Sequence, residues 1–118
     1  MARQYPSKRA TGARYEETAV DFLRQMGYEI LERNYRDRLG EIDIVAEEGG
    51  YLVFVEVKYR KDAGNGYPEE AVSVPKQKRI RHTASWYLYQ HGRSEETPCR
   101  FDVVSILGQE ITLIRDAF

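Results

Sequence analysis

The sequence predicts an α/β domain in which a mixed central β-sheet is flanked by two helices, in the order αβββαββ. Three observations support this class. Two apolar, β-branched runs flank Gly49-Gly50, a pair that favours a hairpin because both glycines accept positive φ. Apolar residues at helical spacing precede and follow this hairpin. A second hairpin pattern surrounds Gly108-Gln109, with strands expected over 99–107 and 110–114.

Length and composition exclude several classes of protein. The 118 residues suffice for one hydrophobic core, and 42% apolar with 31% charged residues is typical of a globular chain. The net charge of −1 gives no overall attraction to nucleic acid, so such contact needs a local basic patch. The single cysteine, Cys99, fits a reducing compartment. No run of about 20 apolar residues and no signal-peptide pattern is present, so we expect a cytoplasmic protein without a membrane partner.

The start of the chain is read as an arm followed by a helix. Residues 1–10 are basic and carry no hydrophobic pattern, so we expect a flexible arm there and a single domain over 11–118. The cations of the arm either contact phosphates or are simply solvated. Thr11 is a candidate N-cap for the first helix, which we expect to end before Gly27. Its buried stripe is Tyr15, Ala19, Phe22, Leu23 and Met26.

Two glutamates of this helix differ in position. Glu16 aligns with Ala19 and Leu23 at the edge of the buried stripe, whereas Glu17 lies on the wet side. Glu16 is therefore the acid that leans toward the sheet. The ordinary explanation, that a first-turn glutamate stabilises the helix dipole, stays open.

The central hairpin brings charged residues together. We expect its strands over about 40–47 and 52–60, after a strand over 28–36 and a turn over 37–40. With Gly49-Gly50 as the turn, the residues that lie opposite each other are Asp43 with Glu56 and Glu41 with Lys58. Period-two alternation places all four side chains on one face. Two carboxylates about 5 Å apart repel by about 3 kcal/mol, so the pattern predicts a cation between them.

Both faces of this hairpin are largely apolar. The charged face also carries Val45, Leu52 and Phe54; the other carries Ile42, Ile44, Val53, Val55 and Val57. Such a hairpin belongs in the middle of a covered sheet, where unpaired charge is expensive. We therefore favour a functional site over the alternative, a wet face on which Glu41 and Lys58 form a surface ion pair.

The second helix begins at a basic cluster. Ser73 is its candidate N-cap, Pro75 fits its first turn, and Gly92 closes it. Its apolar stripe is Ile80, Ala84, Tyr87 and Leu88, extended toward the N-terminus by Gln77. The opening turns carry Lys76, Lys78, Arg79, Arg81 and His82. This cluster is either a phosphate-binding stripe or a solvated face.

The remaining expectations concern single residues and one loop. The segment 61–68 has the composition of a loop and is either a lid over the carboxylates or a plain connector. We expect Trp86 and Cys99 to be packing residues, and His82 and His91 to be surface groups rather than ligands.

The chain also resembles a known family. The motifs that carry the resemblance are Gly12-x3-Glu16-x2-Ala19-x2-Phe22-Leu23, Arg33-Asn34-Tyr35-Arg36, Gly40-Glu41-Ile42-Asp43-Ile44, Phe54-Val55-Glu56-Val57-Lys58-x-Arg60, Gly66-x-Pro68-x2-Ala71-Val72, Lys76-Gln77 and Arg100-Phe101-Asp102-Val103-Val104. In this order they resemble the YraN-type family of uncharacterised bacterial proteins. That family looks like part of the PD-(D/E)XK, restriction-endonuclease-like superfamily and is similar to Holliday-junction resolvases. Tyr15 departs from the pattern, because relatives typically carry glycine there.

The resemblance implies a restriction-endonuclease-like core and a set of site residues. By position, Asp43 and Glu56 correspond to the metal-binding carboxylates, Lys58 to the motif lysine, Glu16 to the helix glutamate of resolvase-like members, and Gln77 to a polar residue from the second helix. With the Val57 carbonyl, the two carboxylates are expected to hold Mg²⁺ or Mn²⁺. The residues expected to contact nucleic acid are Lys76, Lys78, Arg79, Arg81 and Arg60.

The function that the resemblance implies is a metal-dependent nuclease that hydrolyses phosphodiester bonds of DNA, including branched or junction DNA. Related resolvases act as dimers, so a homodimer stays open. One alternative is a non-catalytic nucleic-acid-binding module on a nuclease fold, because fold does not imply function. Another is a protein-interaction subunit that neither cuts nor binds nucleic acid.

Overall fold

The chain forms the predicted α/β arrangement. The computed structural model describes residues 8–61 and 72–118, with side chains described from residue 14 onward. The elements are α1 (Lys8–Gln25), β1 (Glu29–Arg36), β2 (Glu41–Glu48), β3 (Tyr51–Arg60), α2 (Val74–Gln90), β4 (Cys99–Leu107) and β5 (Glu110–Ile114). Their order, αβββαββ, is the predicted one.

The five strands form one mixed sheet in the order β1-β2-β3-β4-β5. The pair β3–β4 is parallel and is connected through α2, whereas the other neighbouring pairs are antiparallel. The β2–β3 register runs from Glu48 opposite Tyr51 to Ile44 opposite Val55. Gly49 and Gly50 form the turn with φ of 60° and 84°, so the predicted hairpin and its register are confirmed.

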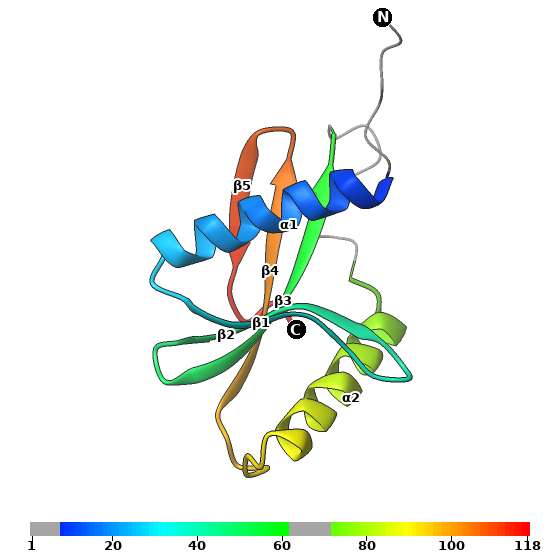
Figure 1. The fold of residues 1–118 in the computed structure, drawn as a ribbon, viewed down its shortest axis with the longest axis vertical. Coiled ribbons are helices and arrows are strands. Elements are labelled where there is room, and N and C mark those ends of the chain that lie inside the picture. Colours follow the sequence, from blue (N-terminus) through cyan, green and yellow to red (C-terminus); the bar gives the residue numbers. More distant parts are fainter. Residues whose placement is uncertain (1–7, 62–71) are drawn as a thin grey trace, which may run out of the picture.

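Each helix covers one face of the sheet. On the α1 side, Ala19, Val20 and Leu23 pack against a group from three strands, namely Ile44, Ala46, Val53, Val55, Val104 and Ile106. On the α2 side, Ile80, Ala84 and Tyr87 pack against Val45, Leu52, Phe54 and Phe101. Figure 1 shows α1 crossing the strands in the upper half of the view and α2 lying below. The central hairpin is therefore covered on both faces, as predicted.

The alternation of faces is interrupted on β2. Ile42 packs in the α2-side cluster, although period two places it beside Ile44 on the α1 side. The partners of these residues on β1 are Tyr35 and Arg33, so Asn34 lies between them in the ladder. Asn34 has φ of 55°, which a strand interior does not adopt, and the local turn of the backbone changes the face. Asp43 lies on β2 at the same level.

Helix α1 ends before Gly27, as predicted, but it differs from the prediction in its start and in the burial of Met26. It begins at Lys8, so Thr11 is an interior residue rather than the N-cap, and the first seven residues of the predicted arm lie outside the described part. Met26 is 44% exposed, whereas Val20 is fully buried. Met26 follows the last helical residue, where the chain turns at Gly27 with φ of 91°.

Helix α2 has the predicted boundaries. The Ser73 hydroxyl accepts a hydrogen bond from the Lys76 N–H, proline follows at the first turn, and Gly92 has φ of 62° just after the helix. Trp86, however, is 41% exposed, so its predicted packing role is wrong. At about 100° per residue, Trp86 lies about 110° around the helix from the centre of the buried face, which consists of Ile80, Thr83, Ala84 and Tyr87. Cys99 packs against the α2-side core, as expected.

In the part of the chain that the structure describes, neither helix is long and apolar enough to cross a membrane.

Candidate active site

Asp43 lies where the β2–β3 ladder ends. The last paired residues on this side of the hairpin are Ile44 and Val55. Just beyond them, Asp43 Oδ2 accepts a hydrogen bond of 2.8 Å from the Val57 backbone N–H. The Asp43 carboxylate thus accepts the hydrogen bond that a backbone carbonyl of the neighbouring strand accepts in a regular ladder. This contact fixes Asp43 beside Glu56 and Val57, the neighbours that the hairpin register predicts.

The environment of Asp43 disfavours its charged form. Burial is the main cause that raises its pKa to about 7, and the negative charge of Glu56 is the second. The Val57 N–H opposes the rise, whereas the charges of Glu41 and Glu16 add to it. The predicted electrostatic conflict between the two carboxylates is therefore present, and Asp43 titrates near neutral pH.

Glu56 is held by two ammonium groups. Glu56 is 7% exposed, and its Oε1 lies 2.5 Å from Lys76 Nζ and 3.4 Å from Lys58 Nζ. Burial opposes the charge on Lys76, but the contacts with Glu56 and Lys58 and the charge of Asp43 together outweigh burial and raise the Lys76 pKa. Burial lowers the Lys58 pKa, with the neighbouring Lys76 as a further cause. The first turn of α2 therefore supplies a second cation to the carboxylates.

Glu41 does not pair with Lys58. Its carboxylate lies 3.3 Å from Arg36 Nε, and Arg36 is its direct partner in the β1–β2 ladder. Direct cross-strand partners are the closest side chains of two antiparallel strands. The surface ion pair of Glu41 with Lys58, which the alternative interpretation expected, is thus replaced by the pairs Glu41–Arg36 and Glu56–Lys58.

Glu16 leans inward, as predicted. Its side chain is 14% exposed, against 54% for Glu17. Glu16 Oε1 accepts hydrogen bonds from Asn34 Nδ2 at 2.9 Å and Arg33 Nε at 3.3 Å. Its charge contributes to the raised pKa of Asp43. Strand β1 therefore holds the helix glutamate at the edge of the carboxylate site.

Gln77 has a different contact from the expected one. Its Nε2 donates a 3.1 Å hydrogen bond to the Val72 carbonyl, just before α2. The side chain therefore closes the N-terminal turn of the helix. Sequence position alone does not distinguish these uses, because an inward-facing glutamine at a helix start reaches either way.

The other predicted nucleic-acid contacts lie at separate places. Lys78, Arg79 and Arg60 are exposed, the last at the end of β3. Arg81 lies over the rings of Phe101 at 4.6 Å and Phe118 at 5.6 Å. Of the predicted basic set, Lys76 alone contacts a carboxylate of the site among the ion pairs of the described residues.

Comparison with known proteins identifies the family. Residues 15–106 match the model of "Uncharacterised protein family UPF0102". The chain belongs to the UPF0102 family. A UPF0102 protein of Lachnoclostridium phytofermentans is 56% identical over 112 residues, which cover 95% of each chain. One of Caldicellulosiruptor saccharolyticus is 44% identical over 118 residues, covering 95% of this chain and 99% of the relative. The YraN-type resemblance is thus confirmed.

The matched span of this UPF0102 protein contains the whole candidate site. Glu16, Asp43, Glu56, Lys58 and Lys76 all lie within residues 15–106. Sequence reasoning did not assign Lys76 to the carboxylates. The available signal was its place in the first turn of the helix that connects β3 to β4 in the order of the elements, because such a crossover packs its helix on the sheet.

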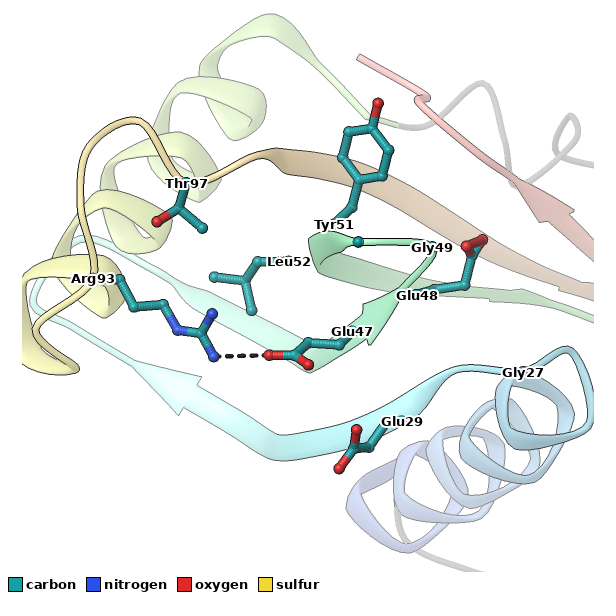
Figure 2. A pocket seen from close by; sticks show the side chains of 10 residues that line it. Gly27, Glu29, Glu47, Glu48, Gly49, Tyr51, Leu52, Arg93 and Thr97 are labelled. Carbon is teal, nitrogen blue, oxygen red and sulfur yellow. Dashed lines mark hydrogen bonds and ion pairs between the residues drawn. The ribbon is translucent and has the colours of Figure 1, made fainter.

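A hollow of the UPF0102 protein lies at the turn end of the hairpin, away from the carboxylates. It has a volume of about 370 Å³ and is lined by residues that include Glu29, Glu47, Gly49 and Arg93. Figure 2 shows Arg93 reaching Glu47, and their ion pair measures 2.9 Å. No predicted site residue lines this hollow. Across residues 8–61 and 72–118, no group of three or more His, Cys, Asp or Glu side chains is placed to hold a metal.

Proposed function

We propose that this UPF0102 protein is a metal-dependent nuclease with a restriction-endonuclease-like core that hydrolyses phosphodiester bonds of DNA, branched or junction DNA included. The observation that carries the proposal is the placement of Asp43 beside Glu56 at the end of the β2–β3 ladder, with the Lys58 ammonium 3.4 Å from Glu56. Two adjoining carboxylates and an ammonium are the groups that metal-assisted phosphodiester hydrolysis uses. The proposed site therefore rests on the chemistry of its side chains.

The residues fit a hard divalent cation. Mg²⁺ binds proteins through one or two carboxylates and keeps several waters, so Asp43 and Glu56 suffice as side-chain ligands. The N–H and C=O of one strand residue point to the same side, and the Val57 N–H faces Asp43, so the Val57 carbonyl is aimed there too. When bound, the ion polarises the phosphate and lowers the pKa of a bound water. Mn²⁺ prefers the same oxygen ligands.

The protein side chains then have separate roles. Asp43 and Glu56 bind the cation, and the charge of Glu16 adds to the negative potential at Asp43. Lys58 stabilises the negative charge that develops on the phosphate oxygens. Lys76 pairs with Glu56, and with a cation in its place it would be free to contact a neighbouring phosphate.

The test is a cleavage assay on junction, flap and single-stranded DNA with Mg²⁺ or Mn²⁺. The wild type is expected to cut at least one of these substrates, and Asp43→Asn is expected to lose cutting but keep binding. Asp21→Asn, which changes an exposed carboxylate on α1, is the matched control and should cut like the wild type. Absence of cutting on every substrate would overturn the proposal.

A second candidate is the non-catalytic nucleic-acid-binding module. Two observations favour it: Glu56 forms ion pairs with two lysines, and the pKa of Asp43 is raised. The lysines balance the charge of Glu56 and a proton can neutralise Asp43, so the site needs no metal ion to balance its charge. This candidate predicts DNA binding that weakens steeply with salt, with no cutting. Absence of both binding and cutting would instead favour a protein-interaction role.

A further inference from the structure

Helix α2 extends away from the carboxylate site with an unusual charge distribution. Between Val74 and Gln90 it contains no aspartate or glutamate, although the whole chain has a net charge of −1. Lys76 at its start contacts Glu56. At about 100° per residue, Arg79, His82, Trp86 and Tyr89 lie within an arc of about 80° on one face. A basic and aromatic stripe therefore starts next to the candidate active site.

The far end of this stripe carries exposed aromatic rings. Trp86 is 41% exposed and Tyr89 is 75% exposed. Their ring centroids lie 5.3 Å apart with an interplanar angle of 25°, so the two rings stack on each other. Stacking fixes both side chains before any ligand arrives, which lowers the entropy cost of binding a further flat ring.

The turn between β1 and β2 forms the opposite wall. Arg38, Leu39, His82 and Trp86, with Asp37, line a groove of about 480 Å³, and Leu39 is 53% exposed. The groove thus combines apolar surface with cations. It lies on the same helix face as the stripe and is continuous with it.

Asp37 anchors this wall to α2. Its Oδ2 lies 2.9 Å from His82 Nδ1, and its Oδ1 accepts hydrogen bonds from Thr83 and from the N–H groups of Leu39 and Gly40. The Asp37 side chain is 6% exposed. The carboxylate is therefore covered by its donors and does not face an incoming anion, while the wall is held in place.

We propose that this groove binds unpaired nucleobases of a single-stranded DNA segment that leads away from the candidate active site. Bases stack on Trp86 and Tyr89, and the backbone phosphates contact Arg38 and Arg79. Aromatic platforms flanked by cations bind single strands in this manner, whatever the base sequence. The rise from Lys76 to Trp86 is roughly 15 Å, so the segment between the two places is a few nucleotides long. The inference deepens the proposed function and rests on its nucleic-acid substrate.

The single tryptophan of the chain makes the test direct, because all tryptophan fluorescence comes from Trp86. Titration with a short single-stranded oligothymidylate at low salt is expected to quench this fluorescence, and a blunt duplex of equal length is expected to quench it much less. Trp86→Ala should weaken binding of a fluorescein-labelled single strand by about 5- to 100-fold, measured by anisotropy. Trp86→Phe should retain most of the affinity, because it keeps an aromatic face.

The matched control is Tyr51→Ala. Tyr51 is 43% exposed and lies at the opposite end of the central hairpin, so its loss should leave single-strand affinity unchanged. Thermal melts of each variant establish that it is folded. Unchanged affinity in folded Trp86→Ala would overturn the inference. So would a change from dimer to monomer in sedimentation without any loss of binding, because the groove would then be an interface between two copies.

Failure of the inference and failure of the proposed function give different results. Cutting of branched DNA by a protein whose Trp86 neither responds to nor affects single-strand binding would overturn the inference alone. Quenching of the wild-type fluorescence and loss of affinity in Trp86→Ala, without cutting by the wild type, would support the groove and overturn the proposed nuclease activity.

Discussion

Lys76 Nζ lies 2.5 Å from Glu56 Oε1, although one residue opens α2 and the other lies within β3. The pair joins the helix to the candidate active site and places an ammonium against a carboxylate that we propose binds a metal ion. A cation and Lys76 then compete for the same oxygen.

In the absence of divalent ions, replacement of Lys76 by methionine should destabilise the protein. Glu56 is nearly buried, and loss of one of its two ammonium partners leaves its charge less compensated. The Lys76 side chain is 32% exposed, so we expect a decrease of about 1 to 3 kcal/mol in the free energy of unfolding, less than for a fully buried pair. Urea unfolding measures it. Lys78→Met, on the exposed surface, should change it by less than about 0.5 kcal/mol.

Divalent ions should stabilise Lys76→Met more than the wild type. In the variant, Mg²⁺ meets no competing ammonium from α2 and relieves the repulsion between Asp43 and Glu56. Thermal melts of both proteins, without Mg²⁺ and at concentrations that increase 10-fold from step to step, should show a larger rise of the melting midpoint for the variant. Equal rises in both proteins would show that Lys76 and the ion do not share Glu56.

The stability of the protein should depend on Asp43 in a defined pH window. Its pKa of about 7 in the folded state lies above the ordinary aspartate value of 3.8, so the contribution of Asp43 to stability is fully present below about pH 4 and is lost as the pH rises through about 7. Asp43→Asn removes the ionisation and keeps an oxygen that accepts the Val57 N–H. The variant should therefore gain stability relative to the wild type between pH 4 and 8, by at most about 4 kcal/mol. Asp21→Asn should give a difference that is flat with pH.

Metal binding should oppose that pH effect. A carboxyl group must lose its proton to become a ligand, so the stabilisation by Mg²⁺ should be larger at pH 8 than at pH 6. Melting midpoints at both pH values, with and without the ion, measure this difference. Stabilisation that is independent of pH, or that persists in Asp43→Asn, would place the ion elsewhere.

Asn34 should tolerate glycine but not valine. Its φ of 55° suits glycine, whereas a β-branched side chain is strained there. Asn34→Val should lower the free energy of unfolding by about 1 to 2 kcal/mol or more. Asn34→Gly should keep the backbone and lose only the hydrogen bond to Glu16, so its stability should remain closer to the wild type. Equal losses in both variants would assign the effect to the side-chain contact rather than to the backbone.

Local signals in the sequence determined the elements and the central register. The glycine pair determined the hairpin, because glycine readily adopts the two positive φ values that such a tight turn requires. The position of the turn then determined which residues of the two strands lie opposite each other. Ser73 and Gly92 fixed the limits of α2 through capping. The helical phase of Glu16 predicted its inward lean, which its 14% exposure confirms. These features depend on residues close together in the chain.

Tertiary structure decided which cations and polar groups meet the carboxylates. Lys76 reaches Glu56, Gln77 closes its own helix and Glu41 pairs with Arg36, because the packing of α2 on the sheet and the turn at Asn34 set the reach of each side chain. The exposure of Trp86 has the same origin, since the sheet covers only part of the helix. Sequence spacing alone determined that two acids oppose each other on one hairpin. Only the three-dimensional packing decided which groups surround these two acids, because a long side chain can contact any of several partners that are distant in the sequence.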